Sequence, residues 1–334
     1  MSQRKGISRR DFVKSAGALP IATGLLAGLT RAAAGNGKSR VVIVRSPGVM
    51  PMGTNDPKTD VLKKMVDHAV ARLAGSKSPA EAWGMVATPG DVVGIKVNCI
   101  AGRNISTHHE MARAIAEGLT EGGLPESSVV IWDRQDRELT RCRYEITTEP
   151  EGVRCYGTDN GAGGWSAQPV TVSGQEMKIS SILDRQTTLL INAPIVKDHG
   201  ICGVTGALKN HYGTISNPGA LHGGHCDPHL ANLNSLPAIK DKTRLILADA
   251  LRCIYDGGPG FNEKHIWHEE AVIASKDPVA LDRVIAELIE AQRAKNGHAS
   301  LSQCGRPWSY IQTAGAAGLG RASLSDIDVI EETV

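Results

Sequence analysis

The chain has 334 residues, of which 41% are hydrophobic, 22% charged and 4% aromatic. This is the composition of a globular protein, and it excludes a disordered chain, a collagen-like repeat and a coiled coil. The formal net charge is +2, but residues 1–34 hold six basic side chains and one acidic one, which leaves 31 basic and 34 acidic residues in the remainder. A mildly acidic body with few aromatic residues lacks the basic footprint of a nucleic-acid-binding protein, so no nucleic-acid partner is predicted.

The first 34 residues predict a twin-arginine export signal. The pair Arg9-Arg10 stands in the segment SRRDFVK, ahead of an apolar run at residues 15–29 and of three alanines at 32–34 that suit a signal peptidase. The apolar run is shorter than the roughly twenty residues that a membrane-spanning helix needs, so no stable membrane span is predicted in the mature form. The alternative is an amphipathic helix of the mature fold. The prediction implies the twin-arginine translocon as a partner and a periplasmic or other extracytoplasmic location.

The rest of the chain alternates between short β-branched runs and segments with apolar residues at helical spacing, which predicts an α/β fold with a mixed, mostly parallel sheet flanked by helices. Residues 140–186, rich in Gly, Ser and Thr, predict a small antiparallel insertion. No internal repeat or linker interrupts residues 35–334, so they are predicted to form a single domain. The predicted strands are residues 40–45, 91–98, 128–132, 187–193, 243–250 and 271–275, and the predicted helices are residues 60–73, 107–119 and 279–295.

Several familiar motifs are excluded. The glycine-rich segments at 35–39, 161–163 and 258–260 lack the full phosphate-loop or dinucleotide-binding pattern, and there is no G-x-S-x-G elbow. None of the seven cysteines forms a C-x-x-C pair, which disfavours an iron–sulfur cluster and a thioredoxin-like site. Whether Cys202 and Cys226 pair or bind a metal stays open, because sequence separation sets no distance in space.

Polar residues concentrate after the strand predicted at 187–193. Five of the eleven histidines fall within residues 199–229. A segment that follows a buried strand in an α/β sheet lies at the carboxyl edge, where ligand crevices form, and histidine and lysine there can bind a metal, an anion or an electrophilic cofactor. The alternative is a polar loop that only satisfies backbone groups and solvent. The candidate residues of this segment are Lys197, His199, Lys209, Asn210, His222, His225 and Cys226.

The same stretch resembles a known family. The segments KDH (197–199), VTGALKNHYG (204–213) and HGGHCDP (222–228), with LADA (247–250) and GGP (257–259), are similar to the domain of unknown function 362 family. The resemblance extends from about residue 41 to about residue 288. It implies the fold of that family and, because members with twin-arginine signals are usual, export from the cytoplasm. The family has no settled activity, and this chain lacks the ferredoxin-type cysteine motifs that many members carry.

A more distant resemblance concerns lactate racemases that use a nickel-pincer nucleotide. Their intervals between a histidine, a lysine that holds the cofactor covalently and a nickel-binding histidine match His199, Lys209 and His225. Asp133 and Arg134 end a strand at the position of the racemase's catalytic segment, although the second catalytic histidine is missing there. The resemblance implies a related site, with a nickel-type metal among the options.

The sequence therefore predicts an exported, metal- or cofactor-dependent enzyme that acts on a small anionic substrate with racemase/isomerase-like or oxidoreductase-like chemistry. The alternative is a periplasmic accessory protein that binds a metal or an anion without turnover. His199 is predicted to act as a general base with a pKa near neutrality, Lys209 to act as an anchor, and Asp133 and Arg134 to orient the substrate. Asp249 is predicted to support a histidine. The predicted cofactor-binding residues are Lys197, Lys209 and Asn210, and the predicted metal-binding residues are His222, His225 and Cys226.

Overall fold

The computed structural model describes residues 37–334. The predicted export signal lies outside the described residues. No helix within residues 37–334 has the length and apolar character needed to cross a membrane.

A mixed, mostly parallel sheet of eleven strands runs through the part of the chain described, in the order β13-β1-β12-β10-β7-β2-β3-β4. Strands β8 and β11 also pair with β10, and β9 pairs with β8. The predicted α/β class is therefore confirmed. The strands are β1 (Ser39–Arg45), β2 (Val93–Lys96), β3 (Val129–Trp132), β4 (Arg154–Cys155), β5 (Val170–Val172), β6 (Gln175–Met177), β7 (Leu189–Asn192), β8 (Ile195–His199), β9 (Gly203–Thr205), β10 (Thr243–Ile254), β11 (Ile266–Trp267), β12 (Ala271–Ser275) and β13 (Ile327–Thr333).

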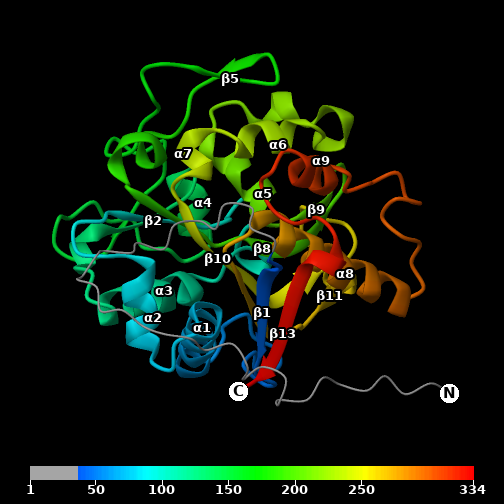
Figure 1. Ribbon diagram of the computed structural model, residues 1–334, viewed down its shortest axis with the longest axis horizontal. Coiled ribbons are helices and arrows are strands. Elements are labelled where there is room, and N and C mark those ends of the chain that lie inside the picture. The colour runs from blue at the N-terminus through cyan, green and yellow to red at the C-terminus, as the bar shows by residue number, and fades with distance from the viewer. Residues whose placement is uncertain (1–36) are drawn as a thin grey trace, which may run out of the picture.

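Helices cover both faces of this sheet (Figure 1). Helices α1, α2 and α3 lie on one face, and α8 and α9 lie on the other, as the packing of α1 and of α8 against β1 and β12 also shows. The helices are α1 (Thr59–Ala74), α2 (Pro79–Val86), α3 (His109–Glu121), α4 (Asp136–Arg141), α5 (Ala207–Asn210), α6 (His229–Asn234), α7 (Pro237–Lys240), α8 (Pro278–Lys295) and α9 (Tyr310–Ala316).

Local sequence explains where the two longest helices begin and end. Pro278 opens α8, and the Asp277 carboxylate accepts hydrogen bonds from the amides of Val279 and Ala280, each at 2.9 Å. Helix α1 ends at Gly75, which adopts the left-handed conformation that glycine reaches without a steric cost.

Alternation along β1 divides the core into two layers. Val41 and Ile43 belong to the cluster under α8, whereas Val42 and Val44 belong to the cluster under α1. All four side chains are buried. A strand that is apolar on both faces needs cover on both, so the continuous β-branched run at residues 40–45 already indicates a sheet between two helical layers.

The boundaries show what the sequence patterns captured. Strand β12 matches its predicted range, and β10 continues four residues beyond its predicted end. The antiparallel pair β5 and β6 confirms a hairpin in the predicted insertion. Strand β13 was not predicted, because its alternation of exposed polar residues with few apolar ones resembles a surface segment, yet it pairs with β1 in parallel register.

Three parallel strands place the site. In the ladders of β2 with β3 and with β7, Lys96 pairs with Trp132 and with Asn192. The carboxyl ends of β2, β3 and β7 therefore lie side by side, and the next residue after β3 is Asp133. Parallel sheets bind ligands outside these ends, so the arrangement puts polar side chains where a crevice forms.

The contact between α2 and α3 gives a stability prediction. A methyl group at Gly118 would overlap the Trp83 indole ring, which is fully buried. We expect Gly118→Ala to destabilise the protein by about 1–3 kcal/mol through overpacking, in spite of alanine's better helix propensity. Urea unfolding measures the change. Gly161→Ala is the control, because nothing lies within 4 Å of a Cβ there, and equal stability of the two variants would contradict the packing argument.

Candidate functional site

The hairpin of β8 and β9 presents the KDH segment. Lys197 lies opposite Thr205, Asp198 opposite Val204, and His199 opposite Gly203. Because side chains alternate along a strand, Lys197 and His199 lie on one face and Asp198 on the other. The Asp198 carboxylate accepts from Arg306 at 2.8 Å and from the amide of Gly258 at 2.6 Å. Asp198 thus holds the hairpin in place on one face, and the opposite face, which carries Lys197 and His199, is left for the site.

A cavity of about 180 Å³ opens on that face. It brings together seven of the ten residues with predicted roles, and it does not include His225, Cys226 or Asp249. Lys96, Asn98, Glu138, Thr205 and Tyr212 also line it, although the sequence analysis did not select them. The predicted residues that line the cavity are Asp133, Arg134, Lys197, His199, Lys209, Asn210 and His222.

A buried ion pair forms one wall of the cavity. The Lys96 Nζ atom lies 2.7 Å from an Asp133 carboxylate oxygen, and both side chains are almost fully buried. Asp133 also accepts hydrogen bonds from the amides of Cys99 at 2.7 Å and of Arg134 at 2.8 Å. A Cβ at Gly213 would lie 2.6 Å from the Lys96 Nζ atom, so a larger residue there would displace a member of the pair. Asp133 therefore serves chiefly to neutralise Lys96.

Asn210 joins the strand ends to one another. Its side-chain amide donates to the Lys96 carbonyl at 3.1 Å and to the Asn192 side-chain oxygen at 2.7 Å. Its own oxygen accepts from Asn98 at 3.2 Å. These contacts give the predicted cofactor-binding residue a scaffolding role within the described structure.

Lys197 is a buried cation with spare donor capacity. Its Nζ atom donates to the Asn98 side-chain oxygen at 3.1 Å and to the Ile105 carbonyl at 3.3 Å. An ammonium group has three donors, so one remains for the cavity. Burial lowers the pKa of Lys197 to about 8, although the Asp133 carboxylate acts in the opposite direction.

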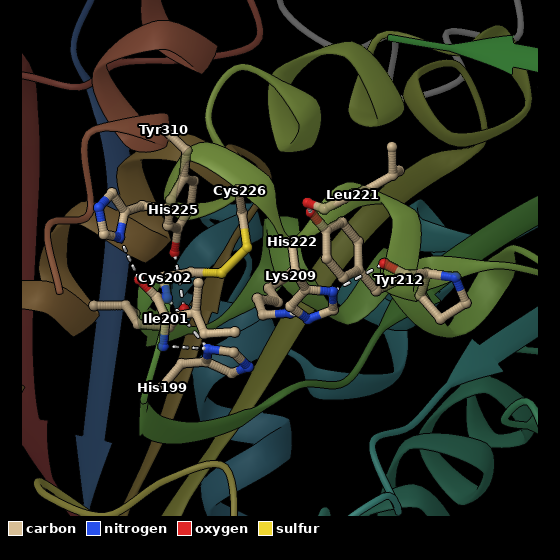
Figure 2. Close-up of a disulfide and its surroundings, with 12 residues drawn as sticks. His199, Ile201, Cys202, Lys209, Tyr212, Leu221, His222, His225, Cys226 and Tyr310 are labelled. Atoms are coloured by element: carbon tan, nitrogen blue, oxygen red, sulfur yellow. Dashed lines mark hydrogen bonds between the residues drawn. A yellow bond between two sulfur atoms is a disulfide. The ribbon is translucent and has the colours of Figure 1, made fainter. Parts of the chain in front are cut away.

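The role of His199 differs from the prediction. Its Nδ1 atom accepts from the amides of Ile201 at 3.1 Å and of Cys202 at 3.2 Å (Figure 2). Burial and the nearby cationic Lys209 lower the pKa of His199 to about 2, so the ring is neutral and its proton resides on Nε2. The pKa near neutrality expected for His199 is therefore not what this environment gives, and its role as a general base stays a prediction. The imidazole is a hydrogen-bond donor to the cavity.

Lys209 and His222 form a contact pair beside Tyr212 (Figure 2). The Lys209 Nζ atom lies 3.1 Å from His222 Nε2 and 4.0 Å from the centre of the Tyr212 ring. His222 Nδ1 donates to the Pro218 carbonyl at 2.9 Å, which leaves Nε2 as an acceptor. Burial, followed by the charge of Lys197, lowers the pKa of Lys209 to about 7. Near neutral pH this amine is available in its uncharged, nucleophilic form.

A carboxylate on α8 holds the turn that carries Lys209. Asp282 accepts from the amides of Ala207 at 2.5 Å and of Leu208 at 3.0 Å, at the start of α5. A Cβ at Gly206 would overlap this carboxylate. Asp282 is fully buried, and burial raises its pKa to about 7. It is a positioning residue that sequence reasoning missed, because it lies more than seventy residues from the segment it supports.

The predicted metal ligands do not converge. Cys226 is bonded to Cys202 in a disulfide, so its sulfur is not a thiolate ligand. His225 lies apart from Lys209, beyond the disulfide in Figure 2, and its Nδ1 atom interacts with the Ile201 carbonyl at 3.0 Å. No group of three or more His, Cys, Asp or Glu side chains in residues 37–334 is arranged to hold a metal ion. The prediction of a metal centre at His222, His225 and Cys226 is thus not supported by their geometry.

Asp249 supports a histidine, though not one of the loop. Its carboxylate accepts from the backbone amide and the Nδ1 atom of His108, both at 2.8 Å. Burial opposes protonation of this ring, but Asp249 outweighs it and raises the pKa of His108. His108 does not line the cavity.

The residues that the sequence analysis missed carried weak signals. Lys96 is a lone lysine in the apolar strand segment DVVGIKVN, so the sequence already shows it as an exception to the apolar pattern of that strand. Thr205 lies in the segment VTGALKNHYG that carries the family resemblance, but its position opposite Lys197 depends on a hairpin that was not predicted.

Comparison with known proteins places the chain in a family. Residues 93–287, more than half of the chain, match the family described as a domain of unknown function (DUF362). The chain belongs to this family, and the resemblance expected from the sequence is confirmed to that extent. No curated protein matches the chain. Among solved structures it is similar to the crystal structure of a Thermotoga maritima protein from a structural genomics consortium, with 10% identity, a TM-score of 0.42 and coverage of 72% of this chain and 60% of that one.

The lowered pKa of Lys209 predicts a pH-dependent stability. Between pH 7 and about 10.5 the unfolded chain binds a proton at this lysine and the folded chain does not, so wild-type stability rises with pH by up to about 1.4 kcal/mol per unit from this group. Lys209→Met removes the contribution. We expect the stability of Lys209→Met relative to wild type to increase as the pH falls from 10 to 7.

Urea unfolding at several pH values measures this difference. The matched control is Lys77→Met at an exposed position, whose stability relative to wild type should not change across the same range. A relative stability of Lys209→Met that stays constant with pH would contradict the assignment of an uncharged Lys209.

Proposed function

We propose that the chain is an enzyme that acts on a small anionic substrate, with Lys209 as the group that forms a covalent bond to substrate or cofactor. The observation that carries the proposal is the clustering of three lysines and Arg134 in one cavity, in which the Asp133 carboxylate is already paired with Lys96. An accessory protein that only binds an anion would need the charges but not the reactive amine.

The charge balance favours an anion. Asp133 neutralises Lys96, whereas Lys197, Lys209 and Arg134 make no ion pair with any carboxylate in the described chain. Burial and the Asp133 charge raise the pKa of Glu138, which weakens its contribution as a counter-charge. A low-dielectric cavity with unpaired cations attracts an anion more strongly than a solvated surface does.

The chemistry of the remaining side chains suits covalent catalysis. Lys209 supplies an amine, and His222 Nε2 is positioned to accept a hydrogen bond from it. His199 lines the same cavity, and its Nε2–H group is left to donate to a ligand because Nδ1 accepts from the backbone. A neutral imidazole donor stabilises negative charge that develops on a carbonyl oxygen. The three side chains therefore provide a nucleophile, a proton acceptor and an electrophilic donor.

The intervals shared with nickel-pincer racemases support an anchoring role for Lys209, since His199 and Lys209 line the same cavity. His225 would have to bind the nickel, but it does not line that cavity. The residues present do not fit a nickel site at His225, and no step of the proposed chemistry passes through one.

We also propose export through the twin-arginine pathway to an extracytoplasmic compartment. The pair Arg9-Arg10 and the small residues at 32–34 support this proposal. The disulfide between Cys202 and Cys226 agrees with it, because such bonds persist in oxidising compartments.

The anion proposal predicts selective stabilisation. At constant ionic strength, small carboxylates such as acetate, lactate and pyruvate should raise the melting temperature, and acetamide should not. A ligand at one hundred times its Kd stabilises by about 2.7 kcal/mol. Lys197→Met should abolish the effect, because it removes a buried cation of the cavity, and Lys77→Met should keep it.

Turnover separates an enzyme from a binding protein. In D2O, wild-type protein should place deuterium at the carbon next to the carboxylate or carbonyl group of at least one stabilising acid, and Lys209→Ala should not. Stabilisation without exchange for the whole panel would identify an anion-binding accessory protein. No stabilisation by any small anion would reject the proposed function.

The export proposal has its own test. Replacing Arg9-Arg10 by Lys-Lys should keep the full-length chain in the cytoplasm of a host with an active twin-arginine pathway, and the wild-type chain should reach the periplasm. Cell fractionation measures the distribution. Equal export of the two chains would show that another route or signal is used.

A further inference from the structure

We propose that the cavity accepts a short 2-oxo carboxylate, with the carboxylate bound by Lys197 and Thr205 and the carbonyl carbon bound by Lys209 as an imine. This inference rests on the proposed function and names its substrate class. It follows from the donors that the cavity leaves unused and from the position of the reactive amine among them.

Thr205 is the first unexplained feature. Its side-chain oxygen is buried and has no hydrogen-bond partner in the described structure, yet the residue lines the cavity. A buried hydroxyl without a partner costs free energy, so an unpaired one on a residue that lines a cavity points to an acceptor supplied by a ligand. The ligand atom can be an acceptor, because a hydroxyl donates as well as accepts.

Lys197 supplies the second donor. It lies directly opposite Thr205 in the β8–β9 ladder, so the two side chains are on the same face of the hairpin. Its two protein acceptors leave one ammonium proton for the cavity. A hydroxyl and an ammonium group from paired residues on one face offer a donor to each of the two oxygens of a carboxylate. The ion pair of the ligand with Lys197 offsets the cost of burying that cation.

The carbonyl group follows from Lys209. The amine lines the same cavity, and Lys197 is close enough for its charge to help lower the pKa of Lys209 to about 7. An amine that is desolvated and adjacent to another cation is the arrangement that favours imine formation with carbonyl substrates. A carboxylate at Lys197 and an attacked carbon at Lys209 within one small cavity suit a substrate whose two groups are adjacent, as they are in a 2-oxo acid.

The step balances without an external reagent. The Lys209 lone pair forms a C–N bond to the carbonyl carbon, and the C=O electron pair moves to the oxygen, which receives the His199 Nε2–H hydrogen bond. A proton passes from the nitrogen to that oxygen with His222 Nε2 as the acceptor in reach. The oxygen then leaves as water with the second nitrogen proton, and the C=N bond forms.

The size of the cavity limits the chain length. Its volume of about 180 Å³ is close to that of a cavity of about 150 Å³ that holds benzene. Ile100, Pro218 and Pro259 add apolar surface to the lining, which suits a short alkyl group. A 2-oxo acid with few carbons fits these dimensions and this mixture of surfaces.

Reductive trapping of the full-length protein tests the inference. The protein is incubated with pyruvate and sodium cyanoborohydride, denatured, and analysed by intact mass and peptide mapping. We expect one adduct on Lys209 with the mass of pyruvic acid less one oxygen atom. The ratio of the trapping rates for pyruvate and acetone should exceed the same ratio measured with free Nα-acetyl-lysine by about tenfold or more, because acetone has no carboxylate.

Two variants test the carboxylate subsite. Thr205→Val and Lys197→Met should each reduce the pyruvate-to-acetone ratio by about tenfold, whereas the exposed-site controls Thr171→Val and Lys77→Met should leave it unchanged. Using the ratio removes any change in the general reactivity of the amine. A cooperative urea-unfolding transition in each of the two variants shows that they remain folded.

The outcomes separate this inference from the proposed function. Stabilisation by pyruvate without an adduct on Lys209 overturns the 2-oxo acid assignment and leaves anion binding intact. An adduct on Lys209 with no preference for pyruvate overturns the Lys197–Thr205 subsite. Adducts confined to exposed lysines, with no stabilisation by any small anion, would reject both.

Discussion

The buried ion pair between Lys96 and Asp133 holds together the edge of the sheet on which the cavity is built. Lys96 ends β2 and Asp133 follows β3, so the pair joins two adjacent strands at 2.7 Å. A buried charge that loses its partner is strongly destabilising, which makes the two residues mutually dependent. Asn210 adds bonds from the Lys209 turn to the same strand ends. The reactive amine is therefore positioned by the edge of the sheet rather than by a mobile loop.

In contrast to Lys96, the buried lysines Lys197 and Lys209 form no ion pair with a carboxylate among the described residues. The protein tolerates these two lysines because burial lowers both of their pKa values, which favours the uncharged amines. Carbonyl, amide and imidazole groups also accept some of their hydrogen bonds. Packing alone gives no reason to keep such groups in the interior. A bound ligand would supply the acceptors that the unused donors of these buried lysines lack. The stability that such residues cost is typical of a functional site.

The sequence predicted the regular parts of the fold because β-branched runs and helical spacing are local signals, as in β12 and α8. It also selected His199 and Lys209, which line the cavity. It failed where a role depends on contacts between distant segments. The tautomer of His199 is set by backbone amides of the β8–β9 turn, and Cys226 is removed from metal chemistry by Cys202. Neither fact follows from spacing.

The disulfide connects the two histidines of the site. The amide of Cys202 donates to His199 Nδ1, and Cys226 lies four residues beyond His222, which contacts Lys209. One covalent bond therefore ties the hairpin that orients the donor imidazole to the segment that orients the acceptor imidazole. The His199 and His222 rings stack with their centroids 5.7 Å apart, and the disulfide links the two segments that carry these rings. Because the donor imidazole of His199 lies so close to the acceptor imidazole of His222, the site needs a rigid frame to keep their orientations distinct. The disulfide supplies this rigidity independently of the sheet.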